Sequence, residues 1–441
     1  MTVTNTSETQ ALYRRGRQRI PGGTQLLSKR PEMFAPDQWP AYYSRAKGVE
    51  VWDLDGRRYI DMSLSGIGAC VLGYADPDVD AAVREAIDRG SMTTLNSPDE
   101  VELADFLCEL HPWAEMVRYG RCGGEAMAMA VRIARAHTRR DKVAFCGYHG
   151  WHDWYLAANL ADDDRLDGHL LPGLDPAGVP RALAGTALPF RYNQIADLEA
   201  IATQQRDGLA AVVMEPVRSH QPNPGFLEQV REIATRLGAV LIFDEVSSGL
   251  RLNCGGAHLV YGVDPDIAVF AKGMGNGYPM AAVIGRGVVM QAAQSTFISS
   301  TYWTDRIGPA AALATLRKYQ RAAVERHLAD VGGRVQAGWR AAASRAGLAV
   351  EVGGIPALSH VGFEHAKPQA VATLFTQLML EKGFLAGKGF YACYAHRPEH
   401  VQEYLAAVTD VFQEIGRVAA AGDVEARLHG PVAHEGFRRL T

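Results

Sequence analysis

LAAVVMEP at residues 209–216, AVLIFDEV at 239–246 and DIAVFAKG at 266–273 are three short apolar runs of the kind that forms buried strands. Between the first two lies FLEQVREIATRLG at 226–238, in which apolar residues recur at helical spacing. Strand, helix and strand in succession are typical of βαβ units, which build a mostly parallel sheet. We therefore predict an α/β fold around this part of the chain.

The length of the chain and the character of its two ends predict how the rest is organised. At 441 residues the chain exceeds the size at which one hydrophobic core keeps growing, so we expect two domains. Residues 41–62 predict a hairpin with its turn at Asp55-Gly56, and helical patterns dominate after about residue 310, notably at 399–416. We expect a large domain over 70–325 and a smaller α+β domain formed by both ends, 1–69 and 326–441.

Charge and composition exclude several classes of protein. The formal net charge of −4 provides no basic field for a phosphate backbone, so we expect no nucleic-acid partner. The six cysteines lack C-x-x-C spacing, which predicts reduced thiols in the cytoplasm rather than a disulfide framework or a zinc site. We find neither an apolar run near the N-terminus for a signal sequence nor the roughly 18 consecutive apolar residues of a membrane span.

Three residues with charged side chains stand where the predicted strands end, namely Glu215, Asp244 and Lys272. Each of these residues is about one βαβ unit from the next in the sequence. We therefore expect neighbouring strands to bring the three side chains to the same edge of the sheet. Open α/β sheets bind their ligands at the carboxyl ends of the strands. The pattern therefore predicts a ligand site around these three side chains.

Lys272 follows the apolar run IAVFA and precedes the glycine-rich GMGNGYP. A lysine that emerges from a buried strand has its amine in a medium of low dielectric, which lowers its pKa and makes it nucleophilic. The glycines after it allow a ligand to approach closely. The alternative is a solvated surface charge, but such lysines rarely end a core strand.

Asp244 ends the apolar run AVLIF, so we expect its carboxylate to be partly buried. A buried carboxylate needs a cationic or hydrogen-bonded partner. A pyridinium nitrogen is one such partner, and a carboxylate beside it keeps the ring protonated and electron-withdrawing. The alternative is a carboxylate that caps the next segment.

Two further stretches carry groups that suit a phosphorylated, aromatic ligand. RYGRCGGEAMAMAVRIARAHT (118–138) is a glycine turn that leads into a helix, where backbone N–H groups can bind a phosphate, although glycine pairs begin many helices. FCGYHGWHDWY (145–155) places several aromatic side chains in a loop after a short strand, where they can stack on a flat ring. For His152 and Trp154 we favour simple loop packing, and a metal site at His149 and His152 lacks further ligands.

With these motifs assembled, the chain resembles the class-III aminotransferases of fold type I, which depend on pyridoxal 5′-phosphate (PLP). Within that family it is most similar to the branch that contains glutamate-1-semialdehyde aminomutase. The resemblance runs from about Ile20 to about Phe412. The motifs that carry it are IPGG (20–23), CGGEA (122–126), YHG (148–150), DEVSSGLR (244–251) and FAKGMGNGYPMAAVIGR (270–286).

The resemblance implies a fold-type-I architecture and a role for each motif residue. Lys272 would hold PLP as a Schiff base and shuttle protons, and Asp244 would pair with the pyridine nitrogen. Val246 and Tyr148 would contact the two faces of the ring, and the glycine turn would bind the phosphate. The implied catalytic residues are Lys272, Asp244 and Tyr148; the implied cofactor-binding residues are Cys122, Gly123, Gly124, Tyr148, Glu215, Asp244, Val246, Lys272 and Thr301.

The family completes its phosphate site with a threonine from the other subunit of a dimer. Thr301 is the best match for it, with Ser300 and Thr304 as alternatives, so the resemblance implies a homodimer with a shared active site. The chain also departs from the family pattern. Cys122 replaces the usual serine, Gly124 replaces a hydroxyl residue, and Ser247 stands where many members have glutamine.

The resemblance implies transamination between a small-molecule amine and a carbonyl compound. The sequences of residues 270–286 and of STYWTDRIGPAAALATL (300–316) are similar to those of family members that act on amino sugars and aminoglycosides in antibiotic biosynthesis. Epimerisation, with Tyr148, Cys122 or a histidine as a second acid, and an aminomutase reaction are the alternatives. The candidate arginines for a second substrate carboxylate are Arg218, Arg251 and Arg306. A non-catalytic relative would be expected to lack Lys272 or Asp244.

Overall fold

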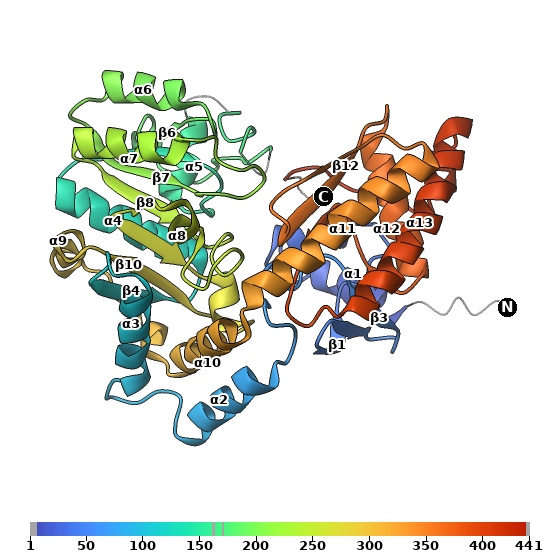
Figure 1. Ribbon diagram of the computed structural model, residues 1–441, viewed down its shortest axis with the longest axis horizontal. Coiled ribbons are helices and arrows are strands. Elements are labelled where there is room, and N and C mark those ends of the chain that lie inside the picture. The colour runs from blue at the N-terminus through green and yellow to red at the C-terminus, as the bar shows by residue number, and fades with distance from the viewer. Residues whose placement is uncertain (1–6, 161–163, 170–171, 438–441) are drawn as a thin grey trace. The chain divides into compact units, whose positions relative to one another are not determined.

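The computed structural model describes residues 7–160, 164–169 and 172–437 (Figure 1). They divide into two compact units. The central unit runs from Pro77 to Glu325, and the end unit combines the described residues up to Asp76 with those from Arg326 onward. All the motif residues of the predicted site from Cys122 to Thr301 lie in the central unit.

A seven-stranded sheet, in the order β4-β10-β9-β8-β7-β5-β6, forms the middle of the central unit. The pairs from β9 through β6 are parallel, whereas β10 runs antiparallel to both of its neighbours. The fold is therefore α/β with a mostly parallel sheet, as predicted. The strands are β4 (Met116–Gly120), β5 (Lys142–Cys146), β6 (Ala187–Pro189), β7 (Leu209–Met214), β8 (Val240–Asp244), β9 (Ile267–Phe270) and β10 (Ala281–Gly285).

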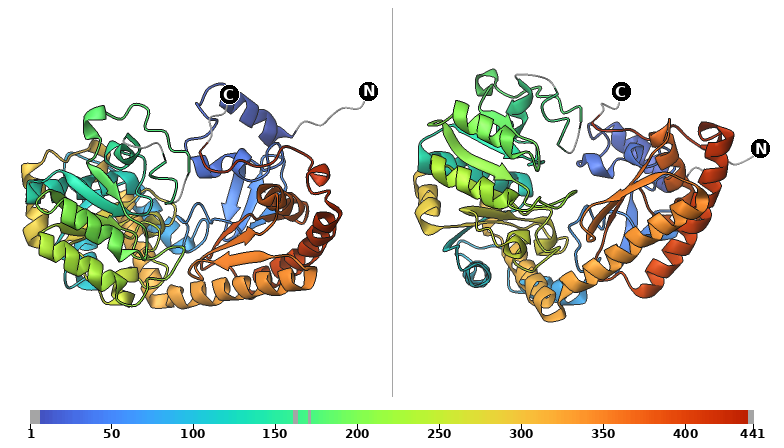
Figure 2. Two further views of the ribbon diagram at one scale, coloured as in Figure 1. Left: turned by 90° about the horizontal axis from the view of Figure 1, so that it is seen from above. Right: turned by 45° about the horizontal axis from the view of Figure 1, so that its top comes forward.

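Alternate residues of the sheet pack into two hydrophobic clusters, one on each face. Val213 and Ile242 belong to the cluster that contains the buried side of α4 (Gly123–Thr138), whereas Val212 and Leu241 belong to the cluster with α7 (Phe226–Leu237). Figures 1 and 2 show the helices covering both faces. A sheet buried on both faces needs strands that are apolar throughout, which explains the continuous apolar runs in the sequence.

The structure confirms the local predictions around these strands. The runs at 209–216, 239–246 and 266–273 form β7, β8 and β9, and 226–238 forms α7. All six apolar residues that define the helical spacing in this segment are buried: Phe226, Leu227, Val230, Ile233, Ala234 and Leu237. The remaining helices of the central unit are α2 (Pro77–Asp88), α3 (Pro98–Leu110), α5 (Asp153–Leu156), α6 (Ile195–Gln204), α8 (Ala257–Tyr261), α9 (Gly287–Met290) and α10 (Ile307–Ala322).

The end unit contains two small sheets, in the orders β1-β2-β3-β13 and β11-β12-β14. The predicted hairpin is present as β2 (Glu50–Asp53) and β3 (Arg58–Asp61), which pair antiparallel around Gly56. β3 also pairs in parallel with β13 (Phe384–Leu385), so strands from the two ends of the chain share one sheet. The other elements are α1 (Glu8–Arg17), β1 (Tyr43–Lys47), α11 (Val324–Ala346), β11 (Val350–Gly353), β12 (Leu358–Phe363), α12 (Pro368–Glu381), β14 (Gly389–Tyr391) and α13 (Pro398–Ala421).

None of the helices in the described residues combines the length and the apolar character that a membrane-spanning helix requires.

Candidate active site

Lys272 lies just beyond the carboxyl end of β9, at the start of the short 3-10 helix η5 (Lys272–Gly275). Its backbone has φ of +45°, in the left-handed region that side-chain-bearing residues rarely occupy. Strain of this kind is concentrated at functional sites, where the surrounding structure holds the residue in place. The four strand residues before Lys272 are buried, so the strand delivers the lysine from the core of the sheet.

The amine of Lys272 lies in an environment that favours its neutral, nucleophilic form. Its Nζ donates a hydrogen bond of 2.6 Å to the hydroxyl oxygen of Ser247. Burial, reinforced by the positive charge of Arg218, lowers the pKa of Lys272 to about 8. The sequence-based expectation of a depressed pKa is therefore confirmed.

Asp244, the last residue of β8, is buried and bonds the buried ring of His149. His149 Nδ1 donates to the Asp244 carboxylate at 2.7 Å, and its Nε2 lies 3.1 Å from the carbonyl oxygen of Cys146. A carbonyl oxygen and a carboxylate oxygen are both hydrogen-bond acceptors, so each ring nitrogen of His149 faces an acceptor. The sequence predicts His149 in an aromatic loop, and no local signal marks it as the partner of Asp244.

Glu215 follows β7 and binds two neighbours through its two oxygens. Oε1 accepts from the guanidinium of Arg218 at 2.9 Å, and Oε2 accepts from the backbone N–H of Tyr148 at 3.3 Å. A Cβ at Gly147 would lie 2.8 Å from Oε2, so only glycine leaves room for this carboxylate. Glu215 thus fixes the backbone from which the Tyr148 side chain projects. Burial raises the pKa of the Tyr148 phenol.

The first turn of α4 supplies the predicted glycine cradle. A Cβ on Gly123 would lie 2.8 Å from a methyl group of Val246, so the bare backbone approaches the loop after β8 closely. The Glu125 carboxylate accepts from the backbone N–H groups of Arg121 and Cys122 at 3.1 and 3.0 Å. The N–H groups of the next residues face the helix end, where an anion is favoured by the helix dipole. Cys122 is exposed, and partial burial of its thiol raises its pKa.

The segment that contains Thr301 lies beside this turn in the same chain. Arg121 donates to the backbone carbonyl oxygens of Trp303 and Asp305, at 2.9 and 3.0 Å. Thr301 and Thr304 are exposed members of the short 3-10 helix η7 (Thr301–Thr304), and Ser300, which precedes it, is exposed as well. All three hydroxyl residues are therefore accessible.

Together these groups fit the parts of PLP. Lys272 would offer an amine of lowered pKa to the aldehyde, and Asp244 would offer a buried carboxylate to the ring nitrogen. The backbone at Gly123, at the N-terminus of a helix, would form a cradle for the phosphate. A side chain at this position would fill the cradle. Tyr148 and Val246 are partly buried neighbours of the same hydrophobic cluster and provide surfaces for a flat ring.

The three candidate arginines differ in their surroundings. Arg218 forms a 2.9 Å ion pair with Glu215, and its positive charge helps to lower the pKa of Lys272. Arg251 is fully buried and lies 3.4 Å from the backbone carbonyl of Ser247. Arg306 forms a 2.6 Å ion pair with Asp99.

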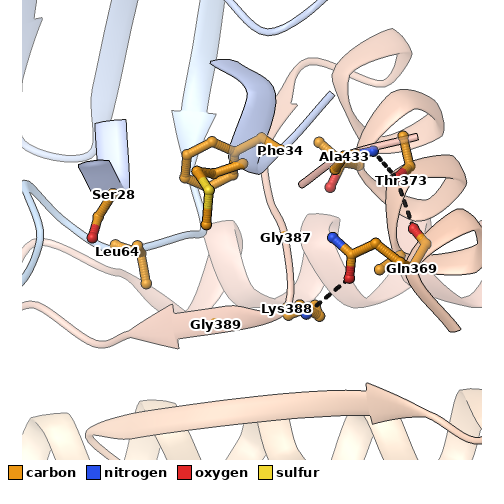
Figure 3. Close-up of a pocket in the computed structure, with 12 residues that line it drawn as sticks. Ser28, Phe34, Leu64, Gln369, Thr373, Gly387, Lys388, Gly389 and Ala433 are labelled. Carbon is orange, nitrogen blue, oxygen red and sulfur yellow. Dashed lines mark hydrogen bonds between the residues drawn. The ribbon is translucent and has the colours of Figure 1, made fainter. Parts of the chain in front are cut away.

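A cavity of about 190 Å³ lies in the end unit (Figure 3). Phe34, Leu64 and Ala433 contribute apolar surface to it. Two of its polar side chains bond each other, since Lys388 Nζ donates to Gln369 Oε1 at 3.2 Å. All the lining residues belong to the end unit, whereas the groups around Lys272 belong to the central unit.

Known proteins with similar sequences and folds include enzymes that transfer amino groups. Residues 33–414 match the family model for class-III aminotransferases. A glutamate-1-semialdehyde 2,1-aminomutase of Roseiflexus castenholzii is 34% identical over 95% of this chain and 100% of its own length. A 3-aminobutyryl-CoA aminotransferase of Cloacimonas acidaminovorans is 31% identical over 92% of this chain and 97% of its own.

A solved structure of a transaminase with PLP bound has a TM-score of 0.83 to this chain, with 28% sequence identity. The match covers 94% of this chain and 99% of that one. The family model spans most of the chain, and both relatives exceed 30% identity over nearly their whole length. This chain therefore belongs to the class-III aminotransferases, and its cofactor is pyridoxal 5′-phosphate.

Proposed function

We propose that this enzyme catalyses net transamination, in which Lys272 holds the cofactor and moves the proton that decides the outcome. When bound, PLP supplies an aldehyde that takes up the amine and a ring that withdraws electrons from the neighbouring carbon. The observation that carries the proposal is the amine of Lys272, with its pKa of about 8, at the end of a strand next to the one that ends in Asp244.

Asp244 and His149 hold a proton on the pyridine nitrogen in this proposal. His149 Nδ1 donates to Asp244 at 2.7 Å and orients the carboxylate, whose remaining lone pairs can accept from the protonated ring. The first turn of α4 binds the phosphate through its backbone, and Tyr148 and Val246 enclose the ring. A hydroxyl from the segment around Thr301, contributed by the partner in a homodimer, would complete the phosphate site.

Lys272 is suited to both accepting and returning a proton near neutral pH, since efficient acid–base groups have a pKa close to the working pH. Ser247 holds the Nζ atom through its 2.6 Å hydrogen bond. In transamination a single group moves the proton from the substrate Cα to C4′ of the cofactor on one face. One residue with the properties of Lys272 is sufficient for that transfer.

Epimerisation needs a second group on the opposite face that can act as base in one direction and as acid in the other. Burial raises the pKa of Tyr148, and partial burial raises that of the Cys122 thiol, so each is less readily deprotonated than the free side chain. These two candidates are therefore poor bases. Weaker bases at these two positions support transamination over reversible epimerisation.

For the acceptor we propose a polyhydroxylated amino-sugar precursor. The basis is the similarity of the sequences at 270–286 and 300–316 to those of family members that act on amino sugars. The surroundings of the arginines agree with a substrate that brings no second carboxylate. Arg306 already binds Asp99, Arg218 already binds Glu215, and Arg251 is fully buried.

An aminomutase reaction is the second candidate, favoured by the 34% identity to a glutamate-1-semialdehyde 2,1-aminomutase. In that reaction the amino group returns to the same molecule, so no separate acceptor is consumed. The two candidates therefore differ in whether the donor skeleton leaves the enzyme as a carbonyl compound.

The test is a spectral screen of amino-sugar and amino-acid donors with the full-length holoenzyme. A productive donor converts the absorbance of the lysine-bound cofactor to that of pyridoxamine phosphate, and a carbonyl acceptor restores it. Each productive donor is then incubated in deuterated water with and without the acceptor. Release of a carbonyl product that depends on the acceptor is expected; deuterium at the amine-bearing carbon without amine transfer, or an isomerised amine, would overturn the proposal.

A further inference from the structure

His152 carries a buried polar atom that the site described so far does not use. Its Nδ1 has no hydrogen-bond partner within the described ranges 7–160, 164–169 and 172–437. The ring stacks on the exposed Trp151, with centroids 4.6 Å apart. Buried polar atoms are nearly always bonded in folded proteins, so an exception of this kind calls for a ligand or another explanation.

The position of the ring relates this atom to the start of α4. A Cβ on Gly124 would lie 3.0 Å from both Nδ1 and Cε1 of His152. Gly150, in the same loop as His152, is just as close, because a Cβ there would lie 3.1 Å from the Gly124 Cα. The imidazole thus occupies the space into which a side chain at position 124 would extend.

The turn itself contains no hydroxyl side chain, because positions 122 to 124 are Cys, Gly and Gly. Burial lowers the pKa of His152, and the nearby carboxylates of Glu125 on α4 and of Asp153, the first residue of α5, act in the opposite direction. The Glu125 carboxylate is also bonded to the backbone at the helix start. A phosphate bound here would gain from an additional donor that offsets this negative charge.

We propose that His152 is a phosphate ligand: its Nδ1–H donates to a phosphate oxygen of PLP and replaces the hydroxyl side chain that positions 122 and 124 lack. The sequence by itself favours loop packing for this residue. The proposal rests on PLP as the cofactor and not on transamination as the outcome, so either can fail without the other.

The first experiment measures how the full chain, freed of cofactor, binds pyridoxamine phosphate and unphosphorylated pyridoxamine. His152→Ala is expected to weaken binding of pyridoxamine phosphate at least about tenfold, the effect of losing a hydrogen bond to a charged group. Binding of pyridoxamine should stay unchanged. His152→Asn, whose amide nitrogen can take the place of Nδ1, should recover much of the loss. Equal weakening for both compounds, or no weakening, would show that His152 only packs the loop.

The second experiment uses the steric relation between the two positions. Gly124→Ser alone should weaken binding of pyridoxamine phosphate, because its Cβ would displace the His152 ring. In the His152→Ala background the same serine has room, and its hydroxyl should strengthen binding relative to His152→Ala alone. The sign of the Gly124→Ser effect is therefore expected to reverse; the same sign in both backgrounds would overturn the proposal, and melting temperatures check that each variant folds.

The pH dependence gives a third readout. A bound phosphate favours protonated His152, so binding takes up a proton and the advantage of the native chain over His152→Asn should grow as the pH falls from 8 to 6. A ratio of affinities that is constant over this range would contradict the proposed contact.

Discussion

Asp244 and Glu245 are adjacent in the sequence, and each bonds a buried histidine, yet their surroundings differ. The Glu245 carboxylate accepts from the backbone N–H and Nδ1 of His258, at 2.8 and 2.9 Å, and from the Ser248 hydroxyl at 2.5 Å. The hydrogen bonds from His258 and Ser248 outweigh the effect of burial and hold the pKa of Glu245 below its usual value. Trp113 Nε1 lies 3.2 Å from His258 Nε2 and donates to it, so the second ring nitrogen of His258 faces a donor.

Asp244 has fewer partners. It accepts from His149 Nδ1 and from the backbone N–H of Val246, at 2.7 and 2.9 Å. Alternate residues along β8 pack in different clusters, Ile242 with α4 and Phe243 with α7, so adjacent carboxylates begin from opposite faces of the sheet. We infer that the Glu245–His258 pair, which has more hydrogen bonds, stabilises the fold. The Asp244 carboxylate can accept further hydrogen bonds, and we infer that the Asp244–His149 pair binds the ligand.

The largest expected difference is in activity. Asp244→Asn removes the charge proposed to hold the ring proton, so amine transfer should slow by about 10²–10³-fold. Glu245→Gln makes the same change of charge on the other face of the sheet. It should leave the rate of amine transfer within about threefold of that of the native enzyme. Single-turnover absorbance with a productive donor measures both. If the two variants lose activity equally, the separation of roles is wrong.

Stability should show the opposite order. His258→Ala leaves Glu245 buried without its main partner, and loss of one member of a buried pair costs about 3–5 kcal/mol. His149→Ala in the holoenzyme should cost less, because Asp244 keeps the pyridine nitrogen as a proposed partner. Urea denaturation of the two holoenzymes, followed by circular dichroism, compares the free energies of unfolding. A larger loss for His149→Ala would reverse the interpretation.

A smaller effect concerns the pH at which the cofactor attaches. Only the neutral amine of Lys272 reacts with the aldehyde, so the rate of PLP attachment to the cofactor-free chain should rise with pH and level off above about 8. Arg218→Gln removes a nearby positive charge, which favours the protonated amine and should shift the midpoint upward. Arg306→Gln, whose arginine pairs with Asp99, is the matched control. An unchanged midpoint in Arg218→Gln would show that the charge of Arg218 does not act on the pKa of Lys272.

The smallest effect is expected in acid. Because the folded-state pKa of Glu245 is lowered, its contribution to stability is complete above its unfolded value, near pH 4.5, and is lost as the pH falls further. Glu245→Gln cannot lose that contribution. The urea midpoint of the native chain should therefore fall more steeply than that of the variant as the pH falls below about 4.5, and parallel slopes would contradict the assignment.

Local patterns in the sequence were sufficient to predict much of the central unit. Continuous apolar runs predicted β7, β8 and β9, and the period of 226–238 predicted α7 with all of its buried positions. They did not predict that β10 is antiparallel, nor the small sheet of β11, β12 and β14. Strands of three to six residues carry little periodic signal, and their direction and partners depend on segments distant in the chain.

The residue types around Lys272 follow directly from the sequence, because a lysine, an aspartate and a glutamate at the ends of successive apolar strands must share one edge of a parallel sheet. Their partners could not be predicted in this way. His149 is 95 residues from Asp244, and Ser247 is 25 residues from Lys272. Nor does the sequence distinguish the surroundings of Asp244 from those of Glu245. Strand order and pleat bring one carboxylate to His149 and the other to His258, because pairing depends on which side of the sheet each side chain leaves.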